Sequence, residues 1–312
     1  MPYVWITGAC GFIGRHLARQ LSDEGHLVAG IGHGHWPLSD ASKWGIKQWV
    51  NGELEAANFD ELALLCGLPE TVFHLAGGSA VGASFSHPLE DFNRTVVATA
   101  RLLDWVRRNA PRTTIVCASS AAVYGAGYIS PIHETSVVNP FSPYGFHKAM
   151  METLCQLHSR SFGGRSVIVR LFSVYGAGIR KQLLWDLCVK LRASGKLRKV
   201  ILGGTGDEIR DWIHIDDVTR LLVRASMRAP EGESVFNGGT GVGMAVREIA
   251  NMVVTAWGGG VDVEFSGQKR PGDPDYLVAD VQHCETLGYK SSVSVREALT
   301  DYVEWFRRAE IK

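Results

Sequence analysis

Residues 7–14 constrain the fold most, because three glycines stand there between a short apolar strand and an amphipathic helix. Residues 3–7 are apolar, and Ile13, Leu17 and Leu21 recur every four residues. In such a unit the first glycine permits a tight turn, the second lets the backbone approach a pyrophosphate, and the third allows close helix packing. We expect this loop to bind a dinucleotide, although a structural turn would show the same glycines. The expected contacts are Gly8, Gly11, Phe12, Ile13 and Gly14.

Strand and helix patterns alternate through the first 175 residues. Strands are expected at residues 27–31, 71–75, 114–118 and 166–172. Helices are expected at residues 89–109 and 143–162. Repeated β-α-β units predict an α/β fold with a doubly wound parallel sheet of the Rossmann type.

The pattern becomes less regular after residue 176. Helices are expected at residues 182–194, 216–227, 246–257 and 295–309, and strands at residues 199–202, 234–237 and 261–265. We expect residues 1–175 and 211–241 to form an NAD(P)-binding domain. Residues 176–210 and 242–312 would form a smaller α/β substrate-binding lobe.

Composition excludes several classes of function. The 32 basic residues balance the 32 acidic ones, so no basic field favours nucleic acid. No apolar run approaches the ~18 residues of a membrane span, and the start reads directly into a strand rather than a signal peptide. The six cysteines form no C-x-x-C pair and the histidines show no ligand spacing, so no metal is expected. These features predict a soluble, cytoplasmic protein.

Three polar residues form a candidate catalytic set. Ser142 and Pro143 can start a helix, on which Tyr144 and Lys148 would lie on one face, a turn apart. A nearby ammonium and the helix N-terminus are expected to lower the pKa of the Tyr144 phenol, which makes it a candidate acid/base. Ser120 follows the strand at residues 114–118, where active-site residues of α/β sheets tend to lie.

Together, T-G-A-C-G-F-I-G, S-S-A-A-V-Y-G and S-P-Y-G-F-H-K resemble the extended short-chain dehydrogenase/reductases, which modify nucleotide sugars. The resemblance implies that Tyr144 is the acid/base, that Lys148 orients the nicotinamide ribose, and that Ser120 binds the reacting sugar oxygen. The family usually has Ser where His147 stands. By the same resemblance Leu75, Ala76 and Gly77 contact the cofactor, and Ser84 contacts the substrate.

The resemblance also covers the second half of the chain. Arg210 and Arg270 stand in motifs similar to the family's two arginines for the nucleotide diphosphate, and Asp273 would accept a ribose hydroxyl. Arginines in ordinary surface ion pairs are the alternative. Ser173 and Thr95 replace two asparagines that the family places near substrate and nicotinamide. A nucleotide-diphosphate sugar is therefore the expected substrate.

The end of the second strand bears on the cofactor. NAD-preferring relatives place an acidic residue there, whereas this chain has Gly32. The missing carboxylate favours NADP, with His33, His35 or Arg15 near a 2′-phosphate, and a tight NAD site is the alternative. Glu53 and Leu54 are expected beside the adenine.

These features predict a role in carbohydrate biosynthesis. The favoured reaction is NADPH-dependent reduction at C4 of a nucleotide-linked 4-keto-6-deoxyhexose. The alternative is a UDP-hexose 4-epimerase with tightly bound NAD, and a non-catalytic NADP-binding redox sensor is a third hypothesis. Ala121 and Ala122 replace a carboxyl-containing pair of the family's 4,6-dehydratases, so a 4,6-dehydratase is not expected.

A homodimer is expected, because the family commonly pairs the two helices at residues 89–109 and 143–162 across a two-fold axis. The apolar candidates for this interface are Val96, Val97, Leu102, Leu103, Leu154 and Leu157.

Overall fold

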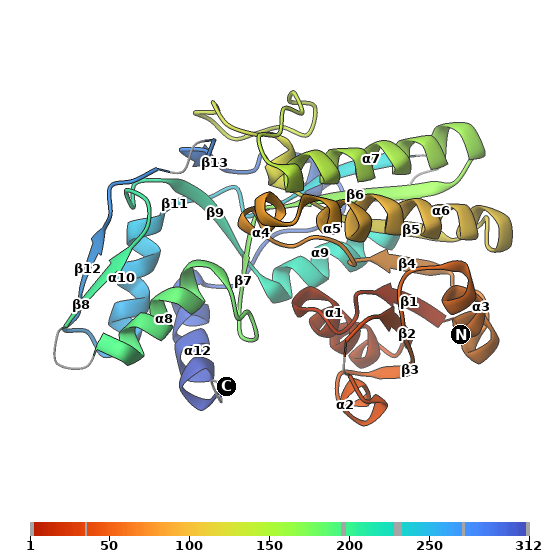
Figure 1. The fold of residues 1–312 in the computed structure, drawn as a ribbon, viewed down its shortest axis with the longest axis horizontal. Coiled ribbons are helices and arrows are strands. Elements are labelled where there is room, and N and C mark those ends of the chain that lie inside the picture. The colour runs from red at the N-terminus through yellow and green to blue at the C-terminus, as the bar shows by residue number, and fades with distance from the viewer. Residues whose placement is uncertain (1–2, 35, 195–197, 228–232, 270–271, 310–312) are drawn as a thin grey trace.

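The computed structural model describes residues 3–34, 36–194, 198–227, 233–269 and 272–309 (Figure 1). Its main sheet has seven parallel strands in the order β10-β6-β5-β4-β1-β2-β3. They are β1 (Tyr3–Thr7), β2 (Leu27–Gly32), β3 (Ile46–Asn51), β4 (Thr71–His74), β5 (Thr114–Ser120), β6 (Arg165–Leu171) and β10 (Glu233–Gly238). The order reverses between β1 and β4, which opens a crevice at their carboxyl ends. The predicted doubly wound sheet is confirmed.

Helices cover both faces of this sheet (Figure 1). On one face α1 (Phe12–Asp23), α2 (Leu38–Ser42) and α9 (Ile215–Met227) bury apolar side chains against Val116 of β5. On the other, α3 (Ala56–Cys66), α6 (Ala98–Asn109) and α7 (Pro143–Phe162) pack on Ile115. Adjacent strand residues point to opposite faces, so each buried strand feeds two cores.

The expected helix at residues 89–109 is interrupted. It consists of α5 (Pro88–Phe92), a π-helical turn at Asn93–Val97, and α6. Within this turn Thr95 is buried, and its hydroxyl accepts a hydrogen bond from the Gly78 N–H at 2.9 Å. π-turns are frequent at functional sites, and this one carries a side chain to the loop after β4.

The remaining strands form a smaller lobe beside the main sheet (Figure 1). One small sheet joins β7 (Ser173–Tyr175), β9 (Ile209–His214), β11 (Gly243–Ala245) and β13 (Tyr276–Leu277). Another pairs β8 (Lys199–Leu202) with β12 (Asp262–Phe265). Helices α8 (Gln182–Ser194), α10 (Val246–Ala256) and α12 (Val295–Arg308) share one apolar core with these strands. The short helix α4 (Val81–Ser86) lies between β4 and α5 in the chain, and α11 (Gln282–Glu285) lies between β13 and α12.

Five strands of the described chain were not among the expected elements: β3, β7, β9, β11 and β13. β3 lies at the sheet edge and mixes buried, partly buried and exposed residues, so it lacks the continuous apolar run of the central strands. β9 contains the arginine motif. Its polar residues interrupt the apolar pattern that predicts a strand, although Trp212 and Ile213 are buried. The domain boundaries at residues 175, 211 and 241 stay a prediction. Among the described residues, no helix is long and apolar enough to cross a membrane.

Candidate active site

One cleft of about 1140 Å³ runs along the carboxyl ends of the main-sheet strands and continues to the lobe. It brings together predicted residues from all parts of the chain. They are Gly8, Gly11, Phe12, Ile13, Gly14, Gly32, His33, Glu53, Leu54, Leu75, Ala76, Gly77, Ser120, Tyr144, Lys148, Ser173, Arg210 and Asp273. Predicted Arg270 lies outside the described residues.

Two close backbone approaches shape the glycine loop. Gly8 has a φ of +67°, and a Cβ there would lie 2.9 Å from the Ala76 nitrogen. A Cβ on Gly14 would lie 2.4 Å from the Gly8 carbonyl oxygen. Gly8 is therefore required by conformation, and Gly14 by the packing of α1 against the loop.

The N-terminus of α1 opens on the cleft. Gly11 is its N-cap residue and supplies no side-chain cap, and the first turn contains no acidic residue. Phe12 and Ile13 of this turn line the cleft. Free N–H groups and the helix dipole favour an anion here, so the residues present fit the pyrophosphate of a dinucleotide.

No carboxylate stands at the end of β2. Gly32 is buried there, and a Cβ on it would lie 3.3 Å from the Trp49 ring. His33 is exposed beside it and lines the cleft. Glu53 and Leu54 line the cleft after β3, as expected for residues near an adenine.

Arg15 is directed elsewhere. Its Nη2 donates to the Cys10 carbonyl oxygen at 2.6 Å, and its guanidinium lies 5.5 Å from the centre of the Trp44 ring. It braces the glycine loop and is not among the residues that line the cleft in the described chain. Of the three side chains expected near a 2′-phosphate, His33 lines the cleft, Arg15 does not, and His35 lies outside the described residues.

A buried hydrogen-bond chain holds the loop that contains Leu75, Ala76 and Gly77. His74 Nδ1 lies 2.8 Å from Thr7 Oγ1, and its Nε2 lies 2.9 Å from Thr99 Oγ1. The Ala76 N–H donates to the Thr7 hydroxyl at 3.2 Å. Burial lowers the pKa of His74 to about 3, so this imidazole stays neutral and serves to position the loop.

The three candidate catalytic residues meet at the centre of the cleft. The Ser142 hydroxyl accepts from the Gly145 N–H at 3.1 Å and starts α7, as predicted. Lys148 is buried, and its Nζ donates to the Ala118 carbonyl oxygen at 2.8 Å. That Nζ also lies 5.9 Å from the centre of the Tyr144 ring. Ser120 ends β5 and hydrogen-bonds the Tyr144 side chain.

Burial controls the charges of this group. It raises the pKa of the Tyr144 phenol, while the hydrogen bond from Ser120 lowers that pKa and the charge of Asp91 raises it further. The expected lowering of this pKa is therefore wrong in sign, because desolvation of the phenolate outweighs the favourable contacts. Burial also lowers the pKa of Lys148 to about 8, against opposing contributions from Cys117, Asp91 and Glu152.

Ser84 has a different position from the one the resemblance implies. It is buried behind the cleft and is not among its lining residues. Its hydroxyl donates to the Val81 carbonyl oxygen at 2.7 Å and accepts from the Tyr144 N–H at 3.0 Å. In this structure Ser84 anchors the first turn of α7 and so positions Tyr144.

The lobe end of the cleft carries charge. Arg210 is largely buried in β9, and its Nη2 lies 3.9 Å from Asp273 Oδ1. Ser173 also lines the cleft, from β7, which follows strand β6 of the main sheet in the chain. An arginine fork beside a carboxylate suits a diphosphate and a ribose hydroxyl.

Lys181 and Gln182 are among the cleft residues that were not predicted as contacts. Lys181 Nζ donates to the Ser79 carbonyl oxygen at 2.9 Å, a bond between two loops 102 residues apart, and burial lowers its pKa. Gln182 has a φ of 63°, in the left-handed region that non-glycine residues rarely adopt. Backbone strain at Gln182 beside the half-buried Lys181 indicates that these two residues belong to the site. Hydrophobic periodicity in the sequence cannot reveal such residues.

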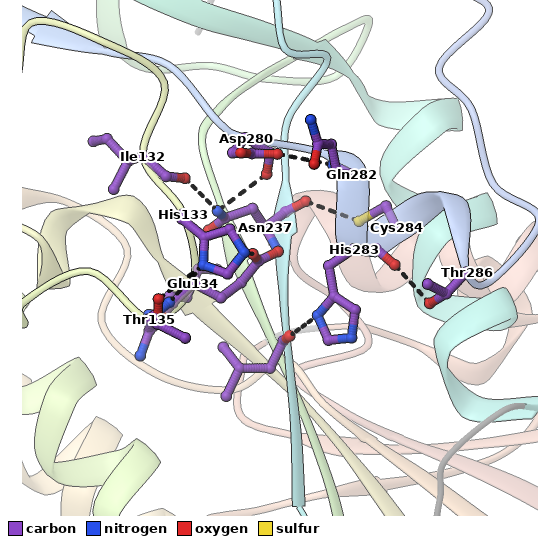
Figure 2. Close-up of polar contacts among 12 residues, drawn as sticks. Ile132, His133, Glu134, Thr135, Asn237, Asp280, Gln282, His283, Cys284 and Thr286 are labelled. Atoms are coloured by element: carbon purple, nitrogen blue, oxygen red, sulfur yellow. Dashed lines mark hydrogen bonds and ion pairs between the residues drawn. The ribbon is translucent and has the colours of Figure 1, made fainter.

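A buried polar frame supports the catalytic strands. Arg170 pairs with Glu152 at 2.7 Å, and its Nη1 donates to the Tyr124 hydroxyl at 3.0 Å. Tyr124 donates to Asn237 Oδ1 at 2.6 Å. Figure 2 shows that the Asn237 amide also donates to two carbonyl oxygens, those of Ile132 at 2.7 Å and Asp280 at 3.2 Å.

The histidines and cysteine near Asn237 are structural (Figure 2). His133 Nδ1 lies 2.9 Å from Thr135 Oγ1, and His283 Nδ1 lies 2.9 Å from the Val235 carbonyl oxygen. The Cys284 thiol donates to the Asn237 carbonyl oxygen at 3.2 Å. Within the part of the chain that the structure describes, no group of three or more His, Cys, Asp or Glu residues could hold a metal.

Several known proteins are similar to this chain. It is 31% identical to a UDP-glucose 4-epimerase of Azospirillum brasilense, over 92% of this chain and 87% of that protein. It is 28% identical to a UDP-glucose 4-epimerase of Mycolicibacterium smegmatis, over 97% of each. These relatives act on UDP-linked sugars according to their names.

Solved structures share the whole fold. MoeE5 in complex with UDP-glucuronic acid and NAD superposes with a TM-score of 0.86 at 30% identity, over 98% of this chain and 99% of that one. TunA, described as an NAD-dependent NDP-hexosamine 5,6-dehydratase, superposes with a TM-score of 0.85 at 27% identity, over 99% of each chain. Residues 4–239 match the NAD dependent epimerase/dehydratase family. The resemblance to extended short-chain dehydrogenase/reductases is thus confirmed, and the chain belongs to the NAD dependent epimerase/dehydratase family.

Proposed function

We propose that this protein is an NAD-dependent 4-epimerase of a UDP-linked hexose. One observation carries the proposal: a single cleft joins the glycine loop, the group of Ser120, Tyr144 and Lys148, and the Arg210–Asp273 end. Such a cleft can hold a dinucleotide and a nucleotide sugar with the sugar ring beside Tyr144. Interconversion of UDP-glucose and UDP-galactose without added cofactor tests it.

The residues present suit the chemistry at C4. The glycine loop and the first turn of α1 would hold NAD, which when bound would supply a reversible hydride acceptor for C4 of the sugar. Tyr144 accepts the proton of the C4 hydroxyl as the ketone forms and gives a proton back as the ketone is reduced. Ser120 hydrogen-bonds the Tyr144 side chain and would also donate to the C4 oxygen, and Lys148 keeps a positive charge close to the phenol.

The epimerase is preferred to the 4-ketoreductase expected from the sequence. That expectation depended on the absence of an acid at Gly32, and the position of Arg15 weakens it, because Arg15 braces the glycine loop. Relatives named as UDP-glucose 4-epimerases and a neighbour holding NAD support the epimerase better. A redox sensor without activity is disfavoured, because both Tyr144 and Lys148 line the cleft.

The absence of 4,6-dehydratase activity stays a prediction. Ala121 and Ala122 line the cleft, and their methyl groups can act neither as acid nor as base. The fold alone excludes no dehydratase, because TunA shares it.

Gly32→Asp tests the cofactor. We expect wild-type protein to bind NADH at least as tightly as NADPH, and Gly32→Asp to widen the difference by about tenfold or more. The new carboxylate would accept hydrogen bonds from ribose hydroxyls and repel a 2′-phosphate. The Cβ meets the Trp49 ring at 3.3 Å, a contact that a small ring movement relieves. Fluorescence titration with both reduced cofactors measures the ratio.

Gly32→Asn is the matched control, because it has the same shape without the charge. It should leave the ratio within a few-fold of wild type. Tighter binding of NADPH than NADH by the wild type would contradict the NAD assignment and restore the reductase.

We also propose a homodimer formed through α5 and α7. Phe146, Met150 and Leu157 are exposed along one stripe of α7, and Leu89 of α5 is 70% exposed. Of the residues expected at this interface, Leu102 and Leu103 are instead buried in the chain's own core. Helical spacing alone cannot separate the helix face that packs on the chain's own sheet from the face that is open to a partner.

Light scattering at micromolar concentration should therefore give twice the chain mass. Met150→Glu combined with Leu157→Glu should give a monomer, because it buries two unpaired carboxylates in the apolar contact. Leu64→Glu, at an exposed position of α3, is the control and should stay dimeric. A monomeric wild type would refute the proposal.

A further inference from the structure

A histidine–aspartate pair lies directly beside the catalytic residues. His147 Nδ1 is 2.6 Å from Asp91 Oδ2, and both side chains are nearly buried, with 12% and 8% of their surface exposed. The Phe92 ring covers the imidazole at a centroid distance of 5.5 Å. His147 stands on α7 between Tyr144 and Lys148, and Asp91 stands on α5.

The Asp91 carboxylate lies immediately behind the wall of the cleft. Gly78 lines the cleft, and a Cβ on it would lie 1.8 Å from Asp91 Oδ1. The carboxylate can approach this backbone only because residue 78 is glycine. The Asp91 carboxylate is thus held at the back of the site, against the backbone of a residue that lines the cleft.

We propose that Asp91 and His147 form a positioning pair that sets the charge around the Tyr144 phenol and the Lys148 ammonium. The pair acts through these two residues and does not touch the substrate. The inference rests on the proposed function only in taking Tyr144 as the acid/base.

The electrostatic surroundings of both catalytic groups support this role. Burial raises the pKa of Tyr144, with Ser120 opposing and Asp91 adding to the effect. Burial lowers the pKa of Lys148, and the groups that oppose it are Cys117 of β5, Asp91 of α5, and Glu152 and Cys155 of α7. Lys148 in turn contributes to the low pKa of His74 on β4. Asp91 is the one group that acts on both catalytic residues among these described contacts.

His147 limits the effect of Asp91. Its Nδ1–H donates to the carboxylate, so the positive end of the N–H dipole, or a full charge when the ring is protonated, opposes the negative charge. Glu152 has its own partner in Arg170, at 2.7 Å. The two members of the pair therefore act on Tyr144 and Lys148 in opposite directions.

Opposite shifts provide the test. Asp91→Asn removes the negative charge and should lower the pKa of Lys148. It should also move the rising limb of the pH–turnover profile, which Tyr144 controls, to lower pH. His147→Ser leaves the carboxylate uncompensated and should move both to higher pH. We expect shifts on the order of half a pH unit in each direction. NMR titration of labelled lysine in the NAD-saturated protein, assigned with Lys148→Met, measures the ammonium without any substrate.

His133→Ser is the matched control. His133 also faces a buried carboxylate, since its Nε2 lies 3.9 Å from Glu134 (Figure 2), but Glu134 is not among the groups that act on Tyr144 or Lys148. The His133→Ser variant should therefore change neither the pKa of Lys148 nor the pH–turnover profile. Asp91→Asn is nearly isosteric and carries the test alone if His147→Ser does not fold.

Shifts of the same sign in both variants, or lower turnover with an unmoved Lys148 pKa, would overturn the proposal and leave the pair a structural contact. The titration needs no substrate, so its result can be interpreted even if the epimerase assignment is wrong.

Discussion

Tyr144→Phe is expected to lower turnover at least about a hundredfold while the affinity for NAD changes little. The substitution removes the hydroxyl that we propose as the acid/base and keeps the ring that lines the cleft. Steady-state turnover and a cofactor titration on the same preparation separate the two effects. Lys148→Met should instead impair both, because this ammonium lies 5.9 Å from the centre of the Tyr144 ring and Lys148 lines the same cleft as the glycine loop.

Tyr128→Phe is the control for this change. Tyr128 donates to the Val137 carbonyl oxygen and is not among the cleft-lining residues. Its turnover should stay within a few-fold of wild type. Near-normal activity in Tyr144→Phe would refute the catalytic assignment.

Glu152→Leu is expected to destabilise the fold by about 3–5 kcal/mol. Glu152 and Arg170 are both about 95% buried, and the change leaves the guanidinium with only the neutral partners Tyr124 and the Glu134 carbonyl oxygen. Ser119 also loses the carboxylate to which it donates. Urea unfolding should show the loss as a lower midpoint with an unchanged slope.

Glu304→Leu gives the comparison. Its pair with Arg308 spans 3.2 Å on an exposed helix face, so the loss should stay below about 1 kcal/mol. A double change of Glu152 and Arg170 to methionine should recover much of the stability, because it leaves no buried charge. A loss below about 1 kcal/mol in Glu152→Leu would show that Arg170 finds another partner.

The glycine loop and the catalytic set could be predicted from sequence because their geometry is local. Strand, turn and helix fix where Gly8 and Gly14 lie, and a helical repeat fixes Tyr144 relative to Lys148. Ser120 joined them because the end of β5 and the start of α7 meet at one edge of the sheet. The parallel order follows from the repeated β-α-β pattern.

Contacts between distant segments could not be predicted in this way. Asp91 meets His147 across 56 residues, and Lys181 meets Ser79 across 102. The sign of the Tyr144 pKa shift was wrong because spacing reveals neighbouring charges and says nothing of burial. Ser84 shows the same limit, since the family resemblance gives no indication that its hydroxyl accepts from the Tyr144 N–H at the start of α7.

The most direct test of the central claim follows one hydrogen atom. Purified protein is incubated with UDP-glucose deuterated at C4, without added cofactor, and the products are analysed by NMR and mass spectrometry. The account predicts the C4 epimer with deuterium retained at C4 and no net change in cofactor oxidation state. The same test applies to UDP-glucuronic acid, the ligand of MoeE5. Failure to interconvert either sugar, together with stoichiometric NADPH consumption on a nucleotide-linked 4-keto sugar, would contradict it.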